Sequence, residues 1–294
     1  MIENDNPYDL LAVENDNHRW AFGTGFTDPL AGVDVTIPDG VDAAALAQYC
    51  LMLGDDALIL SHRLQQWIAR LPELEEETAV ANIALDLLGQ ARMLLARAAA
   101  ADPALGADED RLAFFRSEGQ FRNVRLVERA DADFAELVGR LLVFSAWRLA
   151  LFEHLVGGAD QVLAAIAAKG VNELAYHRDY AGQWVIRLGD GTELSRERMR
   201  RALTVIWPLV PELFASHQVE QRLPGVAADA ASLRPAFDAV LDQVLAAAGL
   251  HRPDAAPLAA IRNRQGRDGV HTEALGYVLA ELQAVARAHP DATW

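Results

Sequence analysis

The stretch that most constrains the fold is residues 73–98, where apolar side chains recur at three- and four-residue steps. This spacing places them on one broad face of an α-helix. Pro72 precedes a first turn rich in glutamate, which suits the positive end of a helix dipole, so the helix start is well marked. Gly89 predicts the close approach of another backbone. A polar line that includes Asp86 and Gln90 marks where any chemistry of this helix is expected.

Three further segments have the same periodicity and complete a four-helix pattern. A helix over about residues 42–70, capped by Asp42, precedes the helix over residues 73–98. The short connection between these two helices predicts an antiparallel hairpin. Residues 133–156 and 160–188 predict a second hairpin, and a longer crossover with a short helix at about 109–116 joins the two. Two such hairpins match the ferritin-like version of the four-helix bundle, so we expect an all-α protein.

The C-terminal part predicts additional helices outside the bundle. Their expected bounds are about residues 195–219, with a cap at Thr192 or Ser195, then 232–248 and 273–288. Two prolines inside the first of these are expected to kink or interrupt it.

The N-terminal part, residues 1–41, contains prolines, glycines and the aromatic motif at residues 20–26. It predicts an irregular arm that packs on the main domain or on a partner, because exposed aromatic side chains favour aggregation. We therefore expect an N-terminal extension over residues 1–41 and a ferritin-like helical domain over residues 42–294.

Charge and cysteine content narrow the class of protein. With 42 acidic and 26 basic side chains the formal charge is -16, which disfavours nucleic acid and anionic membranes as partners. The one weak basic candidate is Arg262, Arg264 and Arg267, either a solvated loop or a contact with an anion or partner. The single cysteine, Cys50, lies in an apolar helix and is expected to be core rather than a nucleophile. We find neither a leader nor an apolar run of membrane-spanning length, which predicts a cytoplasmic protein.

A bundle of this topology can be tested for a di-iron centre. Such centres take a Glu from each of two helices and a Glu-x-x-His pair from each of the other two. None of the eight histidines follows a glutamate by three residues. The only carboxylate at that spacing is Asp268 before His271, in a Gly-rich segment outside the four helices. The ligand count therefore falls short.

Some positions at the expected level of a metal site are nevertheless polar. They are Asp56, Asp86, Glu173 and His177, and Asp56 and Asp86 could face each other across the first hairpin. The favoured interpretation is a structural hydrogen-bonded cluster that fixes helix register. A mononuclear or unusual metal site and an acid/base site remain as alternatives. We predict no catalytic, cofactor-binding or metal-ligating residue in this chain.

Several motifs resemble one protein family. They occur in order at residues 81–92, 108–116, 120–123, 173–192 and 269–276, the first reading Ala-Asn-Ile-Ala-Leu-Asp-Leu-Leu-Gly-Gln-Ala-Arg. The chain resembles the PaaC components of bacterial phenylacetyl-CoA epoxidases over roughly residues 44–294.

That resemblance implies a ferritin-like subunit without iron of its own. It implies pairing with a homologous catalytic subunit that holds the di-iron centre, PaaA, together with a small subunit, PaaB, and a reductase, PaaE. The reductase would carry FAD and an iron-sulfur cluster and take electrons from NADPH. The implied reaction is oxygen-dependent epoxidation of the aromatic ring of phenylacetyl-CoA, with the CoA thioester bound mainly by the partner. The chain alone is expected to be inactive. The alternatives are an independent ferritin-like metal-binding protein and a chaperone for a metal-loaded partner.

Overall fold

The computed structural model describes residue 30 and residues 32–71 and 73–292, and within these residues the secondary structure is helical. The first hairpin consists of α1 (Ala43–Gln65) and α2 (Leu74–Ala101). Asp42 caps α1 by accepting a hydrogen bond from the backbone N–H of Ala45, as predicted. The helix ends at Gln65, a turn earlier than expected, and irregular backbone makes the connection to α2.

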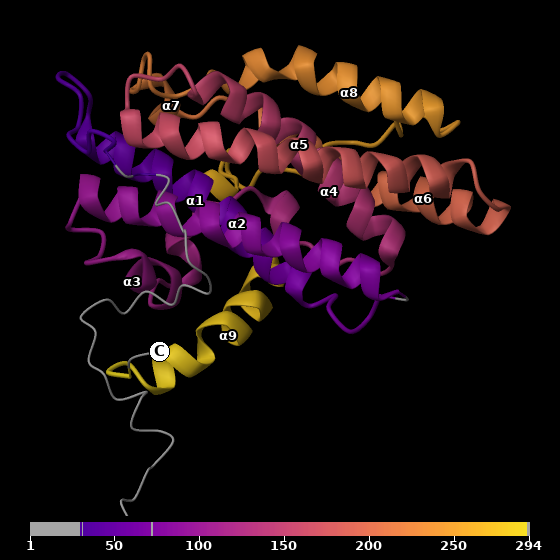
Figure 1. Ribbon diagram of the computed structural model, residues 1–294, viewed down its shortest axis with the longest axis horizontal. Coiled ribbons are helices and arrows are strands. Elements are labelled where there is room, and N and C mark those ends of the chain that lie inside the picture. Colours follow the sequence, from indigo (N-terminus) through magenta and orange to yellow (C-terminus); the bar gives the residue numbers. More distant parts are fainter. Residues whose placement is uncertain (1–29, 31, 72, 293–294) are drawn as a thin grey trace, which may run out of the picture.

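The second hairpin consists of α4 (Phe134–Leu155) and α5 (Gln161–Gly189). The crossover between the hairpins contains α3 (Glu109–Phe114) and two short 3₁₀ turns. Contacts are densest within each hairpin, and α2 also packs against α5, which closes the four helices into a bundle (Figure 1). This is the ferritin-like bundle that the sequence predicted.

The C-terminal helices surround the bundle. They are α6 (Glu193–Ile206), α7 (Gln218–Gln221), α8 (Arg234–Ala247) and α9 (Glu273–Ala288). The helix expected over residues 195–219 is interrupted, as its two prolines predicted: α6 stops at Ile206 and a 3₁₀ segment, Trp207–Phe214, follows. Prolines 208 and 211 cannot donate the backbone hydrogen bonds that would continue the helix. Helices α6 and α8 pack on α4 and α5, whereas α9 lies on the side of α3 (Figure 1).

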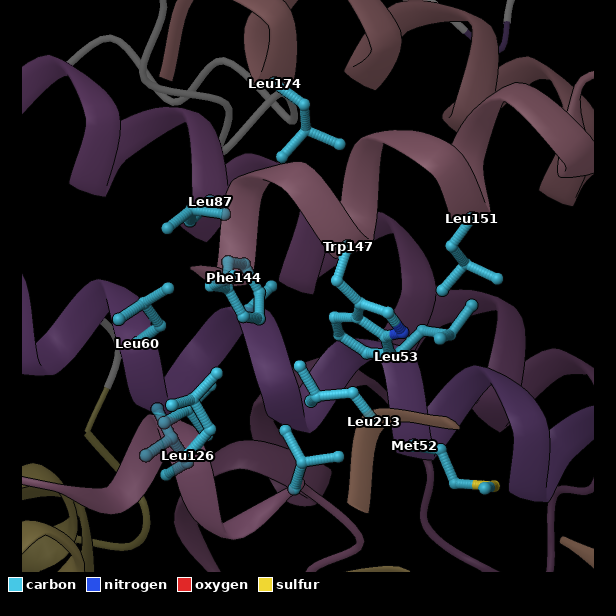
Figure 2. Close-up of a cluster of buried hydrophobic side chains, with 14 of the residues drawn as sticks. Met52, Leu53, Leu60, Leu87, Leu126, Phe144, Trp147, Leu151, Leu174 and Leu213 are labelled. Atoms are coloured by element: carbon cyan, nitrogen blue, oxygen red, sulfur yellow. The ribbon is translucent and has the colours of Figure 1, made fainter. Parts of the chain in front are cut away.

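The core lies between the two hairpins. Leu53 and Leu60 of α1 and Leu87 of α2 meet Phe144 and Trp147 of α4 in a buried apolar cluster (Figure 2). Cys50 is fully buried, and burial raises the pKa of its thiol, which fits the predicted core role.

Two helical glycines contrast in what surrounds them. A Cβ at Gly170 of α5 would lie 2.6 Å from the ring of Phe152, so α4 and α5 approach closely there. A Cβ at Gly89 of α2 would meet no neighbouring atom within 4 Å. The close approach expected at Gly89 is therefore not found among the described residues.

The polypeptide before α1 is described only in part. The aromatic motif at residues 20–26 and Pro72 lie outside the described residues. Arg97 of α2 donates hydrogen bonds to the carbonyl oxygens of Val35 and Thr36 and pairs with Asp160, which fixes residues 35 and 36 beside the bundle.

Among the described residues, α1 and α2 are long and apolar enough to cross a membrane. Buried core helices of globular proteins meet the same criteria. In the most apolar 18-residue stretch, 83% of α1 is buried but only 44% of α2. Helix α1 is therefore a core helix, whereas α2 is more exposed among the described residues and includes the exposed Leu74 and Leu85.

Candidate functional site

A buried arginine lies at the centre of the bundle. Arg148 is the one charged residue in the run of α4 from residue 141 to 152, and its side chain is fully buried. Its Nε donates to Oε1 of Gln90 (3.0 Å) and its Nη2 donates to the carbonyl oxygen of Leu53 (3.1 Å). The guanidinium also lies 4.5 Å from the ring centroid of Phe152. Burial lowers the pKa of Arg148 to about 10, so the group stays protonated at neutral pH and links α1, α2 and α4 by a positive charge.

Asp56 of α1 is the carboxylate that balances this charge. It is fully buried and accepts two hydrogen bonds from Arg267, at 3.0 and 2.8 Å, and a third from the backbone N–H of Val124 at 2.8 Å. Arg148 Nη1 lies 4.0 Å away. Burial raises the pKa of Asp56, while Arg267 and Arg148 act in the opposite direction. A paired guanidinium that bonds both carboxylate oxygens is well suited to a buried site.

The network continues to α5 through Gln90. The amide Nε2 of Gln90 donates to Oε2 of Glu173 (3.0 Å), and Glu173 pairs with Lys169 one turn away. Polar contacts thus run from Asp56 past Arg148 and Gln90 to Glu173. These residues lie on all four helices of the bundle, and their contacts fix the register of the helices.

One turn along the bundle, a second polar pair joins α2 to α5. Nε2 of His177 lies 3.0 Å from Oδ2 of Asp86. The imidazole is fully buried, whereas the Asp86 side chain is 37% exposed. Nδ1 of His177 and Oγ of Ser145 are both buried, and neither has a hydrogen-bond partner among the described residues. The carboxylate orients the imidazole, but the pair has no neighbouring nucleophile or third ligand in hydrogen-bond contact within the described part of the chain.

The four polar positions singled out in the sequence are thus divided between two clusters. Asp86 and His177 contact each other, Glu173 joins the arginine network through Gln90, and Asp56 is held by Arg267. Asp56 and Asp86 share no hydrogen-bond partner among the described residues, so the expectation that they face each other across the hairpin is not met. Within residues 32–71 and 73–292, no three His, Cys, Asp or Glu side chains gather as a metal site requires. The residues present do not fit a di-iron centre, and a guanidinium lies among them instead.

Sequence reasoning missed both arginines of the network. The signal for Arg148 was a single charge within an apolar helix, which is either exposed or buried with partners. Arg267 was grouped with Arg262 and Arg264 as a surface feature. In the structure it inserts into the bundle, whereas Arg262 and Arg264 are exposed. Neither a solvated loop nor a contact with an external anion describes Arg267.

A second anchor holds the crossover to the same helix turn. Asp55, next to Asp56, is fully buried and pairs with Arg116, and it accepts from the backbone N–H of Arg122 at 2.8 Å. Glu128, at the end of the crossover, accepts from Thr272 and lies 2.7 Å from Nδ1 of His271. The crossover and the C-terminal segment are therefore tied to each other and to the bundle.

Comparison with known proteins agrees with this architecture. A family model described as phenylacetic acid catabolic protein, PaaA/PaaC, matches residues 34–294. The chain is 42% identical over 251 residues to the C component of 1,2-phenylacetyl-CoA epoxidase from Escherichia coli (strain K12). That alignment covers 85% of this chain and 99% of the relative. The chain therefore belongs to the PaaA/PaaC family of phenylacetic acid catabolic proteins.

Proposed function

We propose that this chain is a noncatalytic, structural subunit of a bacterial phenylacetyl-CoA epoxidase. In this role it pairs with a homologous di-iron subunit of the PaaA type and supports it. The relative is named as the C component of such an epoxidase, which supports the enzyme system, and the shared family supports a partner of the same fold.

The observation that carries the noncatalytic role is Arg148. In a di-iron bundle, carboxylates and imidazoles from the four helices converge on two metal ions. Here the centre holds a side-chain cation, Arg148, and the carboxylate of Asp56 lies between it and a second arginine, Arg267. A guanidinium donates hydrogen bonds and has no lone pair for a metal. The chain thus keeps the bundle but fills its centre with charge that cannot activate oxygen.

The chemistry would then lie with the other subunits. Iron would be held by the PaaA partner, and electrons would pass from NADPH through the FAD and iron-sulfur cluster of a PaaE-type reductase. A small PaaB-type subunit would complete the assembly. The contribution of this chain is a rigid bundle, cross-linked by buried ion pairs, against which the catalytic subunit folds and docks. We place the complex in the cytoplasm.

Co-expression with the di-iron subunit tests this proposal. The chain and the iron subunit should co-elute from size-exclusion chromatography. Phenylacetyl-CoA-dependent NADPH oxidation should then require both, together with the reductase and small subunit. The chain alone should show no turnover. Turnover that persists after this chain is removed from an assembled enzyme would indicate a chaperone instead.

Metal analysis separates the proposal from an independent metal protein. The chain purified alone should contain far less than one iron per molecule. Near-stoichiometric metal that disappears in Asp86→Ala would contradict the noncatalytic role and favour a site built on Asp86 and His177.

A further inference from the structure

A buried histidine joins the start of α9 to the crossover between the two hairpins. His271 precedes α9, and its side chain is fully buried, as is that of Glu128 at the end of the crossover. Nδ1 of His271 lies 2.7 Å from Oε1 of Glu128, and Nε2 lies 3.0 Å from the carbonyl oxygen of Phe121. A Cβ at Gly269 would lie 2.3 Å from the carbonyl oxygen of Gly119, so a glycine is needed for the two segments to approach this closely.

The two oxygens of Glu128 are fully occupied as acceptors. An ionised carboxylate offers about four lone-pair sites on its two oxygens. Oε1 accepts from Nδ2 of Asn123 at 2.9 Å and faces the ring of His271. Oε2 accepts from the backbone N–H and the hydroxyl group of Thr272, at 2.7 and 2.6 Å. The positive end of the α9 dipole also favours a negative charge at this position. Glu128 is therefore ionised, and Nδ1 of His271 is a donor.

The second ring nitrogen of His271 must donate as well. Nε2 faces the carbonyl oxygen of Phe121, and a carbonyl oxygen can only accept a hydrogen bond. A neutral imidazole carries one N–H and one lone pair, so at one of its two contacts it would set a lone pair against an oxygen lone pair. An imidazolium donates at both contacts, and no buried polar atom of the ring is then without a partner.

The arginines near this pair donate to main-chain oxygens. Nε of Arg63 on α1 donates to the carbonyl oxygen of Glu128 at 2.8 Å. Nη1 of Arg122 donates to the carbonyl oxygen of Phe121 at 2.7 Å. Two carboxylates close by in the sequence, Asp268 and Glu273, contact His217 and Tyr277 instead. The two arginines oppose a second proton on the ring of His271, but among the described residues only the carboxylate of Glu128 bonds to that ring.

We propose that His271 carries a proton on both ring nitrogens at neutral pH and acts as a pH-sensitive latch for α9. Loss of one proton turns one of the two contacts into a repulsion between lone pairs, so the latch weakens as the pH rises. Helix α9 packs mainly on α1, α3 and the crossover turns, outside the four-helix bundle (Figure 1). Because few other elements hold α9, this pair decides how firmly its first turn is attached.

The protonation state is tested by ¹⁵N NMR of the chain labelled at its eight histidines. At about pH 7, both ring nitrogens of His271 should resonate where protonated nitrogens do. The variant His271→Gln identifies these signals by removing them. A ring with one unprotonated nitrogen at that pH would overturn the proposal. If the variant does not fold, assignment of the wild-type signals through the backbone gives the same answer.

Unfolding by urea between about pH 6 and 9 supplies a second measurement. Histidine in an unfolded chain ordinarily titrates at about pH 6.5, so a folded chain that keeps its proton above that pH loses stability as the pH rises. The unfolding equilibrium constant of the wild type, relative to that of His271→Gln, should then rise by up to about tenfold per pH unit. His251→Gln, at an exposed histidine, supplies the baseline from a matched substitution. A ratio for His271→Gln that follows this baseline would refute the latch.

Discussion

Replacing Arg148 by methionine tests the buried network directly. Methionine has a similar length and packs against Phe144 and Phe152, so the substitution removes charge and hydrogen bonds more than volume. Oε1 of Gln90 loses its donor, and Asp56 loses one of its two cationic neighbours. The carbonyl oxygen of Leu53 lies within α1 and keeps a helical donor.

The expected cost follows from these losses. Removing one partner of a buried ionic cluster typically destabilises by about 3–5 kcal/mol, because uncompensated polar groups remain buried. Asp56 retains both hydrogen bonds from Arg267, so the lower end of that range applies, about 3 kcal/mol. For a chain of this size, each 1 kcal/mol lowers Tm by about 2–4 °C, so Arg148→Met should melt about 6–12 °C below wild type.

The assay is thermal unfolding followed by circular dichroism at pH 7. The matched control is Arg200→Met on α6, where the arginine is about half exposed and its ion pairs are 3.8–3.9 Å long. That change should cost less than about 1 kcal/mol. If Arg148→Met melts within about 2 °C of wild type, the network does not hold the bundle together and the reasoning fails.

Three further predictions concern packing, pH and metal. Gly170→Ala should destabilise the folded chain by about 1–3 kcal/mol, because its Cβ would lie 2.6 Å from Phe152. Gly89→Ala should stabilise the free chain by about 0.5–1 kcal/mol. Comparison of their melting temperatures checks both predictions. Burial raises the pKa of Glu220 above its ordinary value of 4.5. The folded protein therefore loses stability as the pH rises from the ordinary pKa of this carboxyl to its raised pKa. The stability of Glu220→Gln relative to wild type should grow over the same pH range by about 1.4 kcal/mol per unit of pKa elevation, measured by melts from about pH 4 to 8, and a flat difference would contradict it. Exhaustive treatment with EDTA should leave the Tm of the purified chain unchanged, and a drop of more than about 2 °C would reveal a structural metal.

The helices were predictable because their signals are local. Side chains of Asp42, Asp133, Asp160 and Thr192 all accept the backbone hydrogen bonds that start a helix. The polar line on α2 also indicated polar contacts between helices, since Asp86 and Gln90 both bond to α5.

The arginines were not predictable because their environment depends on distant parts of the chain. A single charge in an apolar run does not tell whether the side chain is exposed or buried, and only the fold places Gln90 beside Arg148. The prediction of a close approach at Gly89 failed for a related reason. A glycine indicates that another backbone can come close, but it does not indicate which molecule does so. The exposure of Leu85 on α2 became visible only once the described neighbours of that helix were known.

The Arg267–Asp56 ion pair joins residues 211 positions apart in the chain. Closing so long a loop is entropically unfavourable until the intervening helices have assembled. During synthesis, Asp56 is made 211 residues before its partner Arg267. The first hairpin is therefore made well before Asp56 gains its hydrogen bonds from Arg267. A chain truncated before Arg267 would keep most of its helices and still lack the ion pair that holds Asp56.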